Sequence, residues 1–416
     1  MTHYDVVING GGMAGAVLAL GLSQLSRAEG RVLRIAVIEH ASPSLDKHPG
    51  FDARSIALAA HSRELLAHLG LWSLVSDLAS PITDIQVTDL GHLGQLNLSA
   101  SSYGLPALGY VVELHPLGLR FYQQLQQHPH IDLLCPAQID TWQQQLSQVD
   151  IRLTDGRALS CQLLVGADGS HSVIAAQLKL ARRQFDYQQS AIIANVQTEL
   201  PHEGRAFERF TPEGPLALLP LSGGRSSLVW CVSPARASEL MSLGETAFRS
   251  ALQQAFGYRL GKISRSGQLS CYPLHLNEVC RPWHHRVVLV GNAAHLLHPI
   301  AGQGFNLGLR DVAALIECVR QELAQKLAGD SNQDVARDQD PPLDPALDLG
   351  AYSLLSAYGQ SRLADQAELV GTTSALAILF SNADPLLATG RNLGLMTMAA
   401  CTSLKSKLAW RAMGKR

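Results

Sequence analysis

Several features are missing from the sequence, and each absence excludes a class of protein. The seven cysteines are scattered, without a C-x-x-C pair or metal-ligand spacing, so we expect reduced thiols and no metal site. The sequence has 33 lysine and arginine residues and 35 aspartate and glutamate residues. This nearly balanced charge gives no indication of a nucleic-acid partner. No apolar helix reaches the roughly 20 residues that span a bilayer.

The N-terminus also leaves no room for the charged region of a signal peptide, because the first predicted strand begins at Tyr4. We therefore expect a cytoplasmic protein, whose membrane contact, if any, is peripheral and at the inner membrane face. A length of 416 residues suggests two or three domains with ample hydrophobic core.

The first strong motif is a β-branched run at residues 6–8 followed by glycines at G-x-G-x-x-G spacing and an apolar helix at 13–25. Gly10 allows the tight turn, Gly12 lets a pyrophosphate approach bare backbone, and Gly15 lets helix and strand pack closely. The motif predicts a dinucleotide site; a purely structural strand–turn–helix is the alternative.

Two charged residues after this motif extend the prediction. A second strand, 35–38, ends at Glu39, where a carboxylate accepts hydrogen bonds from a ribose. Arg54 precedes a predicted helix, 55–69, and its cation could reach a phosphate or a ring system. An ordinary surface arginine is an equally good interpretation of Arg54.

Two later segments repeat the pattern of a buried strand followed by a small-residue turn. The strand at 159–165 leads to Asp168, and the strand at 287–290 leads to a Gly-Asn turn and a glycine-rich loop before a helix at 304–327. Backbone amides at such a helix start suit negative charge, as on a reduced flavin. The cofactor-binding candidates are Gly10, Gly12, Gly15, Glu39, Arg54, Asp168, Asn292, Pro299, Gly302, Gln303 and Gly304.

Three nucleotide-type motifs exceed what an NAD dehydrogenase needs, and their order resembles the single-component flavoprotein aromatic hydroxylases of the para-hydroxybenzoate hydroxylase type. The stretches GFDARSIALAA, EGRAFERFTPEGPLALLPL, VLVGNAA and LHPIAGQGFNLG look like the ubiquinone-biosynthesis branch of that family, across nearly the whole chain. The wider family usually has aspartate where Asn292 stands. Asparagine keeps an acceptor oxygen, and the ubiquinone branch shares it, so we do not expect lost function.

The resemblance implies a mechanism. FAD is reduced by NAD(P)H or another donor, captures O2 as a C4a-hydroperoxide and transfers OH to the ring of a polyprenylated phenol. A base that draws the phenol proton would help, and His295 and His298 lie nearest the flavin loop, although a structural role is favoured for each. Two alternatives stay open: a non-catalytic FAD-binding subunit of a ubiquinone-biosynthesis complex, and a plain NAD(P)-dependent dehydrogenase.

The predicted fold is α/β, with a Rossmann-like FAD-binding domain, an antiparallel-sheet substrate domain and a helical C-terminal tail. The antiparallel strands are expected mainly at 190–233, followed by helical segments at 236–256. The tail is expected to break at 382–385 and at Gly390. The predicted parts are 1–80, 116–180 and 281–328 for FAD binding, 81–115 and 181–280 for substrate, 329–350 as a mobile insert, and 351–416 as C-terminal helices.

The end of the tail has a composition of its own. Residues 391–416 contain six basic residues, no acidic one and several interspersed apolar side chains. This pattern suits docking on an anionic membrane face or on a partner that carries the prenyl lipid. A helix that packs on the core and leaves a solvated basic end is the alternative.

Overall fold

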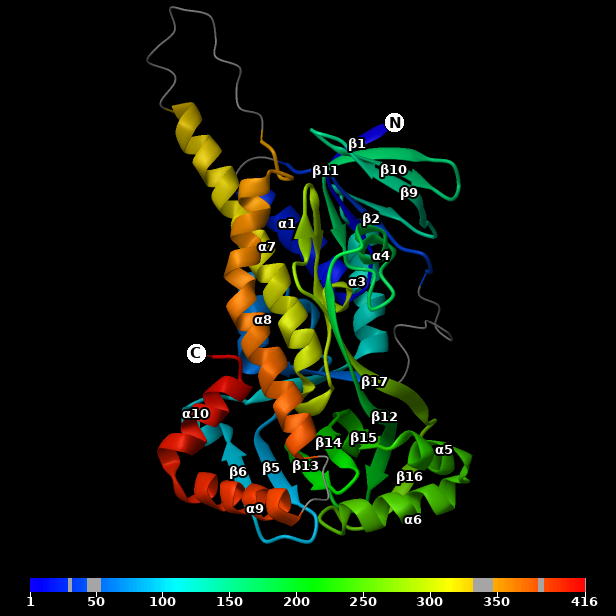
Figure 1. The fold of residues 1–416 in the computed structure, drawn as a ribbon, viewed down its shortest axis with the longest axis vertical. Coiled ribbons are helices and arrows are strands. Elements are labelled where there is room, and N and C mark those ends of the chain that lie inside the picture. The colour runs from blue at the N-terminus through cyan, green and yellow to red at the C-terminus, as the bar shows by residue number, and fades with distance from the viewer. Residues whose placement is uncertain (29–31, 43–53, 332–346, 381–384, 416) are drawn as a thin grey trace, which may run out of the picture.

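The computed structural model describes residues 1–28, 32–42, 54–331, 347–380 and 385–415, and an eight-stranded sheet forms its upper part in Figure 1. The strands are β1 (Thr2–Asn9), β2 (Ile35–Ile38), β8 (Ile131–Leu134), β9 (Ile139–Gln144), β10 (Val149–Leu153), β11 (Ala158–Gly166), β18 (Trp283–His284) and β19 (Val287–Leu289). β1 runs parallel to β2 and β11, and β11 runs parallel to β19. Because carboxyl ends of parallel strands share one edge, this sheet brings the three turn motifs together.

Four helices pack against this sheet and against one another: α1 (Met13–Ala28), α3 (Leu114–Gln127), α7 (Gln303–Ser331) and α8 (Tyr352–Phe380). The side chains of Val6, Val7 and Ile8 are fully buried, as expected for a strand covered on both faces. A Cβ on Gly21 would lie 2.5 Å from Cδ1 of Ile316, so the small residues of α1 allow α7 to approach closely.

A nine-stranded sheet forms the lower part of the molecule (Figure 1). Its strands are β5 (Asp84–Asp89), β6 (Gln95–Ser99), β12 (Arg182–Thr198), β13 (Arg205–Thr211), β14 (Gly214–Pro220), β15 (Arg225–Val232), β16 (Ile263–Ser266), β17 (Ser270–Val279) and β20 (His295–Leu296). Its pairs are antiparallel except β13 with β5, which run parallel. Helices α5 (Pro234–Ser242) and α6 (Glu245–Phe256) cover one face through Leu240, Phe248 and Leu252.

A third, three-stranded sheet joins the two parts. It consists of β3 (Ser55–Ala59), β4 (Ala79–Ile82) and β7 (Gly109–Glu113). Helix α2 (Ala60–His68) follows β3 directly and contacts this sheet, whereas α4 (Val173–Leu178) follows β11 and packs on the eight-stranded sheet. The predicted helix over 55–69 is therefore wrong in its first five residues. Those residues pair with β7 in antiparallel register, and this pairing overrides the weak helix preference of an Ala- and Leu-containing segment.

The C-terminal helices α9 (Pro385–Ala400) and α10 (Thr402–Ala412) pack at the β6 end of the large sheet (Figure 1), where Leu395 contacts the cluster around Leu96 and Leu98. The predicted break at Gly390 is wrong, because α9 continues through that residue. Most of the other predicted break, 382–385, lies outside the described residues. So does most of the predicted insert, of which 329–331 belong to α7. Within the described ranges, no helix has both the length and the apolar character needed to cross a membrane.

Candidate active site

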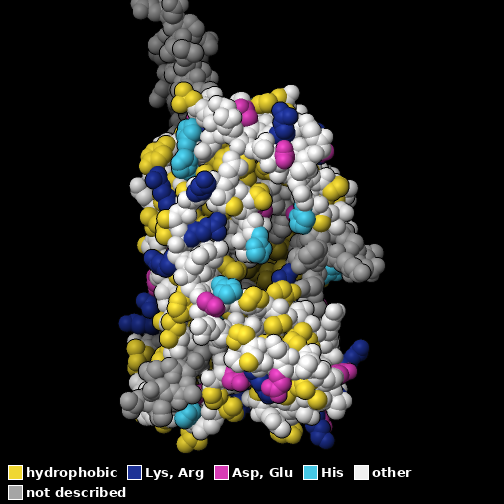
Figure 2. Space-filling model, turned by 45° about the vertical axis from the view of Figure 1, so that its right-hand side comes forward, with side chains coloured by type: hydrophobic (Ala, Val, Ile, Leu, Met, Phe, Trp, Pro, Cys, Tyr) yellow, Lys and Arg dark blue, Asp and Glu magenta, His cyan; other side chains and the backbone are white. Residues whose placement is uncertain are grey.

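A cavity of about 1090 Å³ lies between the three turn motifs and the large sheet. Figure 2 shows the molecule hollowed at mid-height, with hydrophobic side chains inside the hollow. Ten of the eleven predicted cofactor residues line the cavity: Gly10, Gly12, Glu39, Arg54, Asp168, Asn292, Pro299, Gly302, Gln303 and Gly304. The tertiary structure thus brings together residues from distant parts of the chain, and Gly15 lies behind them.

The first glycine turn has the geometry that a phosphate requires. Gly10 has φ +111°, and a Cβ there would lie 2.5 Å from the carbonyl oxygen of Ala167. A Cβ on Gly15 would lie 1.9 Å from the carbonyl oxygen of Gly10, so this residue permits close packing of helix and strand. A Cβ on Gly12 would meet no other atom within 4 Å, because this position faces open space beside the cavity. The turn therefore fits a dinucleotide pyrophosphate.

Glu39 is held at this turn by backbone donors. Its Oε2 accepts a hydrogen bond from the amide of Gly11 at 2.8 Å, and its Oε1 accepts one from the amide of Ala41 at 3.1 Å. His40 Nδ1 lies 2.8 Å from Oε1. The buried carboxylate is thereby fixed beside the turn, where an acidic residue can contact a ribose.

Asp168 has one oxygen occupied and one available. Oδ2 accepts hydrogen bonds from Asn9 Nδ2 at 2.8 Å and from the amide of Val173 at 2.9 Å. Burial raises the pKa of Asp168, although hydrogen bonds from Ser172, Val173 and Asn9 oppose the shift. Among the described residues no partner is found for its buried Oδ1. A buried acceptor without a partner fits a hydroxyl donated by a bound cofactor.

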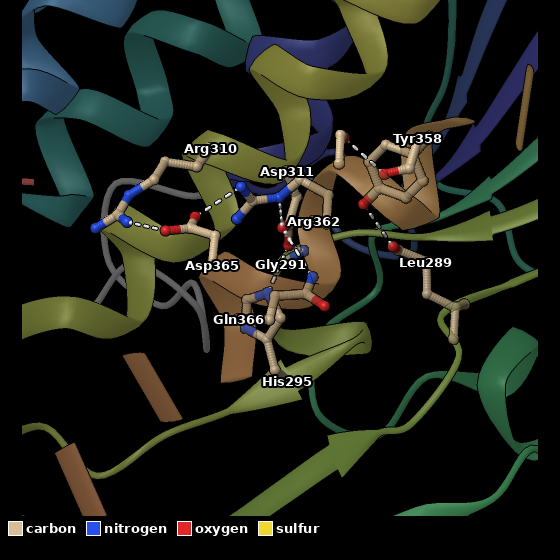
Figure 3. Close-up of polar contacts among 10 residues, drawn as sticks. Leu289, Gly291, His295, Arg310, Asp311, Tyr358, Arg362, Asp365 and Gln366 are labelled. Carbon is tan, nitrogen blue, oxygen red and sulfur yellow. Dashed lines mark hydrogen bonds and ion pairs between the residues drawn. The ribbon is translucent and has the colours of Figure 1, made fainter. Parts of the chain in front are cut away.

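The third turn, a short 3₁₀ helix η4 (Gly291–Ala293), is anchored by the buried carboxylate of Asp311 (Figure 3). The amide of Gly291 donates to Oδ2 of Asp311 at 3.3 Å, and His295 Nε2 lies 2.5 Å from the same oxygen. Arg362 Nε donates to Oδ1 at 2.8 Å, and Gln366 Nε2 donates to it at 3.1 Å. Four donors from three segments thus converge on one carboxylate.

This network, the Asp311 network, extends along α7 and α8. Arg362 also donates to Asp365 at 2.6 Å, and Arg310 donates to the other oxygen of Asp365 at 2.8 Å. Burial alone would raise the pKa of Asp311, but the charges and hydrogen bonds of His295 and Arg362 outweigh it and hold that pKa below its ordinary value. The network ties η4 to both helices and leaves Asn292 exposed toward the cavity.

The two histidines predicted as acid–base candidates do not line the cavity. His295 is buried, and its Nε2 is within hydrogen-bond distance of Asp311 Oδ2. His298 is buried; its Nε2 lies 3.1 Å from Gln189 Oε1, and its Nδ1 accepts from the amide of Ile300 at 3.2 Å. Burial lowers the pKa of His298 to about 4, so this ring is neutral at pH 7. We infer structural roles for both.

One cavity residue of chemical interest was not singled out from the sequence. Glu208 of β13 lines the cavity on the sheet side. Its only signal in the sequence is a charge inside the alternating segment RAFERFT, and the alternation does not reveal which face is covered. The described residues contain no cluster of side chains that could hold a metal ion.

Asn292→Asp should retain FAD, because aspartate keeps the acceptor oxygen at the same position and the backbone of η4 is fixed by Asp311. The flavin content of the purified variant, measured by absorbance against protein concentration, checks this. The control is Asn97→Asp, the same change at an exposed asparagine of β6 outside the cavity lining, which should keep its flavin. Loss of flavin confined to Asn292→Asp would show that the cofactor needs the amide donor of Asn292.

Comparison with known proteins also indicates an FAD-binding protein. The family model described as FAD binding domain matches residues 3–336. The chain is 36% identical to the ubiquinone hydroxylase UbiL of Rhodospirillum rubrum over 99% of this chain and 89% of that protein. It is 31% identical to the 3-demethoxyubiquinol 3-hydroxylase of Escherichia coli, over 99% and 98%. The p-nitrophenol 4-monooxygenase PnpA of Pseudomonas putida has the same fold, with a TM-score of 0.75, 17% identity and full coverage of both chains.

The family match covers well over half of the chain, and two relatives exceed 30% identity across almost all of it. The expected fold class is confirmed, with a mixed FAD-binding sheet, a largely antiparallel second sheet and C-terminal helices. The cofactor of this family is FAD, and the cavity residues described above fit it. The chain belongs to the FAD-dependent aromatic hydroxylases of ubiquinone biosynthesis and is a flavoprotein monooxygenase.

Proposed function

We propose that this protein hydroxylates the ring of a polyprenylated phenol, of the 2-octaprenyl-6-methoxyphenol type, in ubiquinone biosynthesis. The observation that carries the proposal is the two-sided cavity. One wall consists of the glycine turns, and the opposite wall is apolar, with Leu98, Phe210 and Val229 among its residues. Such a wall suits a prenylated phenol better than a small polar acid. The relatives named for ubiquinone and demethoxyubiquinol hydroxylation support a substrate of this class.

The cofactor residues have distinct proposed roles. Gly10 and Gly12 admit the pyrophosphate, Glu39 contacts the adenosine ribose, and Asp168 offers its free oxygen to a hydroxyl of FAD. Asn292 and the loop from Pro299 to Gly304, which line the same cavity, would hold the ribityl chain and the ring. Bound and reduced FAD would contribute the chemistry with O2, which the side chains of the protein cannot carry out. The protein orients the phenol, and its apolar wall keeps water from the reacting atoms.

The test begins with the purified flavoprotein under anaerobic conditions. NADH, NADPH and a chemical reductant are compared as electron donors, and O2 is then admitted together with a prenylated methoxyphenol. We expect a product that gains one oxygen atom on the ring, detected by mass spectrometry. Flavin that is reduced and reoxidised without hydroxylating any prenylphenol would overturn the proposal and favour the non-catalytic subunit.

We further propose that the C-terminal helices bring the enzyme to the lipid phase. Leu393, Met396 and Leu404 are between 46% and 58% exposed on α9 and α10, close in sequence to Lys405 and Lys407. Leu395, Met398 and Leu408 of the same helices line the cavity, so the apolar wall continues to this surface. Exposed apolar side chains among basic ones are typical of contact with an anionic membrane face.

The double variant Lys405→Glu/Lys407→Glu should bind anionic vesicles roughly tenfold more weakly or worse, since each basic residue near such a surface contributes about 1 kcal/mol. Arg411 and Lys415 are left unchanged because they pair with Glu368 and Glu64. Vesicle co-sedimentation and turnover of long- and short-chain phenols are the measurements.

The matched control carries the same charge change on two exposed lysines far from the C-terminal helices in sequence, Lys179→Glu/Lys262→Glu. We expect it to bind vesicles as the wild type does. Slower turnover confined to the long-chain substrate supports delivery by the C-terminal helices, whereas unchanged vesicle binding in the Lys405/Lys407 variant contradicts it.

A further inference from the structure

Glu208 is a carboxylate on an apolar sheet face. It lies in the middle of β13, between Ala206 and Phe210 on the cavity side, and its register partners are Val87 on β5 and Ala217 on β14. None of these side chains can donate a hydrogen bond. In the described part of the chain the side chain of Glu208 forms neither a hydrogen bond nor an ion pair, and the small side chains of Ala206 and Ala217 leave room beside it.

Its surroundings disfavour the charged form. The residue is half-buried and lines the cavity, with apolar side chains beside it on the same sheet face. Burial raises the pKa of Glu208 to about 7. A carboxylic acid with this pKa can both accept and release a proton near neutral pH, which is the property of a general base in catalysis.

On the sheet side of the cavity, the other ionisable groups do not offer a competing base. The thiol of Cys231 on β15 lies in the same lining, and burial raises its pKa far above neutrality. Asp89 ends β5 and is buried in an ion pair with Arg391, and Arg209 follows Glu208 and points to the opposite face of the sheet. The remaining charged lining residues on the helices and on the FAD side include Arg54, Arg310, Asp365, Glu368, Arg411 and Lys415.

We propose that Glu208 is the catalytic base that takes the phenolic proton of the substrate. The phenol O–H bond breaks, the proton moves to a carboxylate oxygen of Glu208, and the electron pair stays on the phenolic oxygen. The step changes no oxidation state, and the proton is released to solvent after the product leaves. The resulting phenolate ring is richer in electrons and therefore reacts more readily with an electrophilic oxygen. This inference rests on the proposed phenol hydroxylation.

The test compares Glu208→Gln with the wild type after chemical reduction of FAD, so that no electron donor needs to be known. Glutamine has the same shape but cannot accept the proton. We expect unchanged flavin content and a hydroxylation rate lower by about 100-fold. The wild-type rate should rise with pH through about 7, and the variant should lose this dependence.

Glu213→Gln is the matched control, because Glu213 is exposed on the same hairpin and outside the cavity lining. It should keep both the rate and the pH profile. A Glu208→Gln variant with wild-type rate and profile would overturn the proposal. So would a variant with a raised KM but an unchanged pH profile, which would make Glu208 a positioning residue. Absence of hydroxylation in the wild type itself would instead reject the proposed function.

A measurement without turnover accompanies the test. The pKa of Glu208 is raised on folding, so the unfolded chain ionises at lower pH than the folded one. Relative to Glu208→Gln, the wild type should therefore lose stability as pH rises from about 4.5 to about 7. A difference in Tm between the two proteins that stays constant from pH 5 to pH 8 would contradict a carboxyl group that titrates near neutrality.

Discussion

Gly12→Val should purify as a folded protein without flavin. A Cβ at Gly12 would meet no other atom within 4 Å, so we expect the variant to keep the fold. The same side chain stands where a pyrophosphate must touch bare backbone, and the branched methyl groups exclude it. Flavin absorbance per mole of protein should fall to less than about a tenth of the wild-type value, and hydroxylation should fall with it.

Gly371→Val is the control for this experiment. Gly371 is exposed on α8, a Cβ there also meets no atom within 4 Å, and the residue does not line the cavity. This variant should keep its flavin. Circular dichroism of both variants verifies folding. A folded Gly12→Val protein with a full flavin complement would show that the first glycine turn is not where the pyrophosphate lies.

Asp311→Asn should lower the free energy of unfolding by about 3–5 kcal/mol, since it leaves buried charges without their partner. Asp311 is fully buried and accepts from His295 and Arg362, and an amide nitrogen at its position would face donors. Urea unfolding of the two proteins measures the difference. Flavin content should also fall, because η4 loses the acceptor for the amide of Gly291.

Glu317→Gln on the same helix is the control for the Asp311 network. Glu317 pairs with Arg320 at the surface, where both side chains are nearly half exposed, and such pairs contribute about 0–1 kcal/mol. An equal loss in both variants would contradict the role given to the Asp311 network. Because the pKa of Asp311 is lowered on folding, its contribution is complete above the ordinary value of 3.8 and is lost as pH falls below it.

The cofactor side of the site was predictable from the sequence because its determinants are local. A buried strand, a glycine turn and a helix start are encoded within about a dozen residues, and each glycine has a steric reason for its place. Parallel pairing of β1, β11 and β19 then brings the three turns to one edge. Ten of the eleven candidates accordingly line one cavity. The resemblance of the motifs to flavoprotein hydroxylases supplied the identity of the cofactor.

The substrate side depended on contacts between residues far apart in the chain. The segment Ser55–Ala59 is a strand because β7 pairs with it. Helix α9 continues through Gly390, and its Leu395 packs against Leu96 and Leu98 of β6, far away in the sequence. His295 and His298 are adjacent to the flavin loop in sequence, yet packing turns both away from the cavity.

By itself the sequence determined the nucleotide-binding turns, the buried strands that carry them and the family, since these features follow from short-range sterics and hydrophobic pattern. Only the tertiary structure decided which face of β13 meets the cavity, and therefore that Glu208 lies in it. The alternation of side chains along a strand defines two faces but does not say which one another part of the chain will cover. The raised pKa of Glu208 arises in the same way, because burial is a property of the assembled sheets.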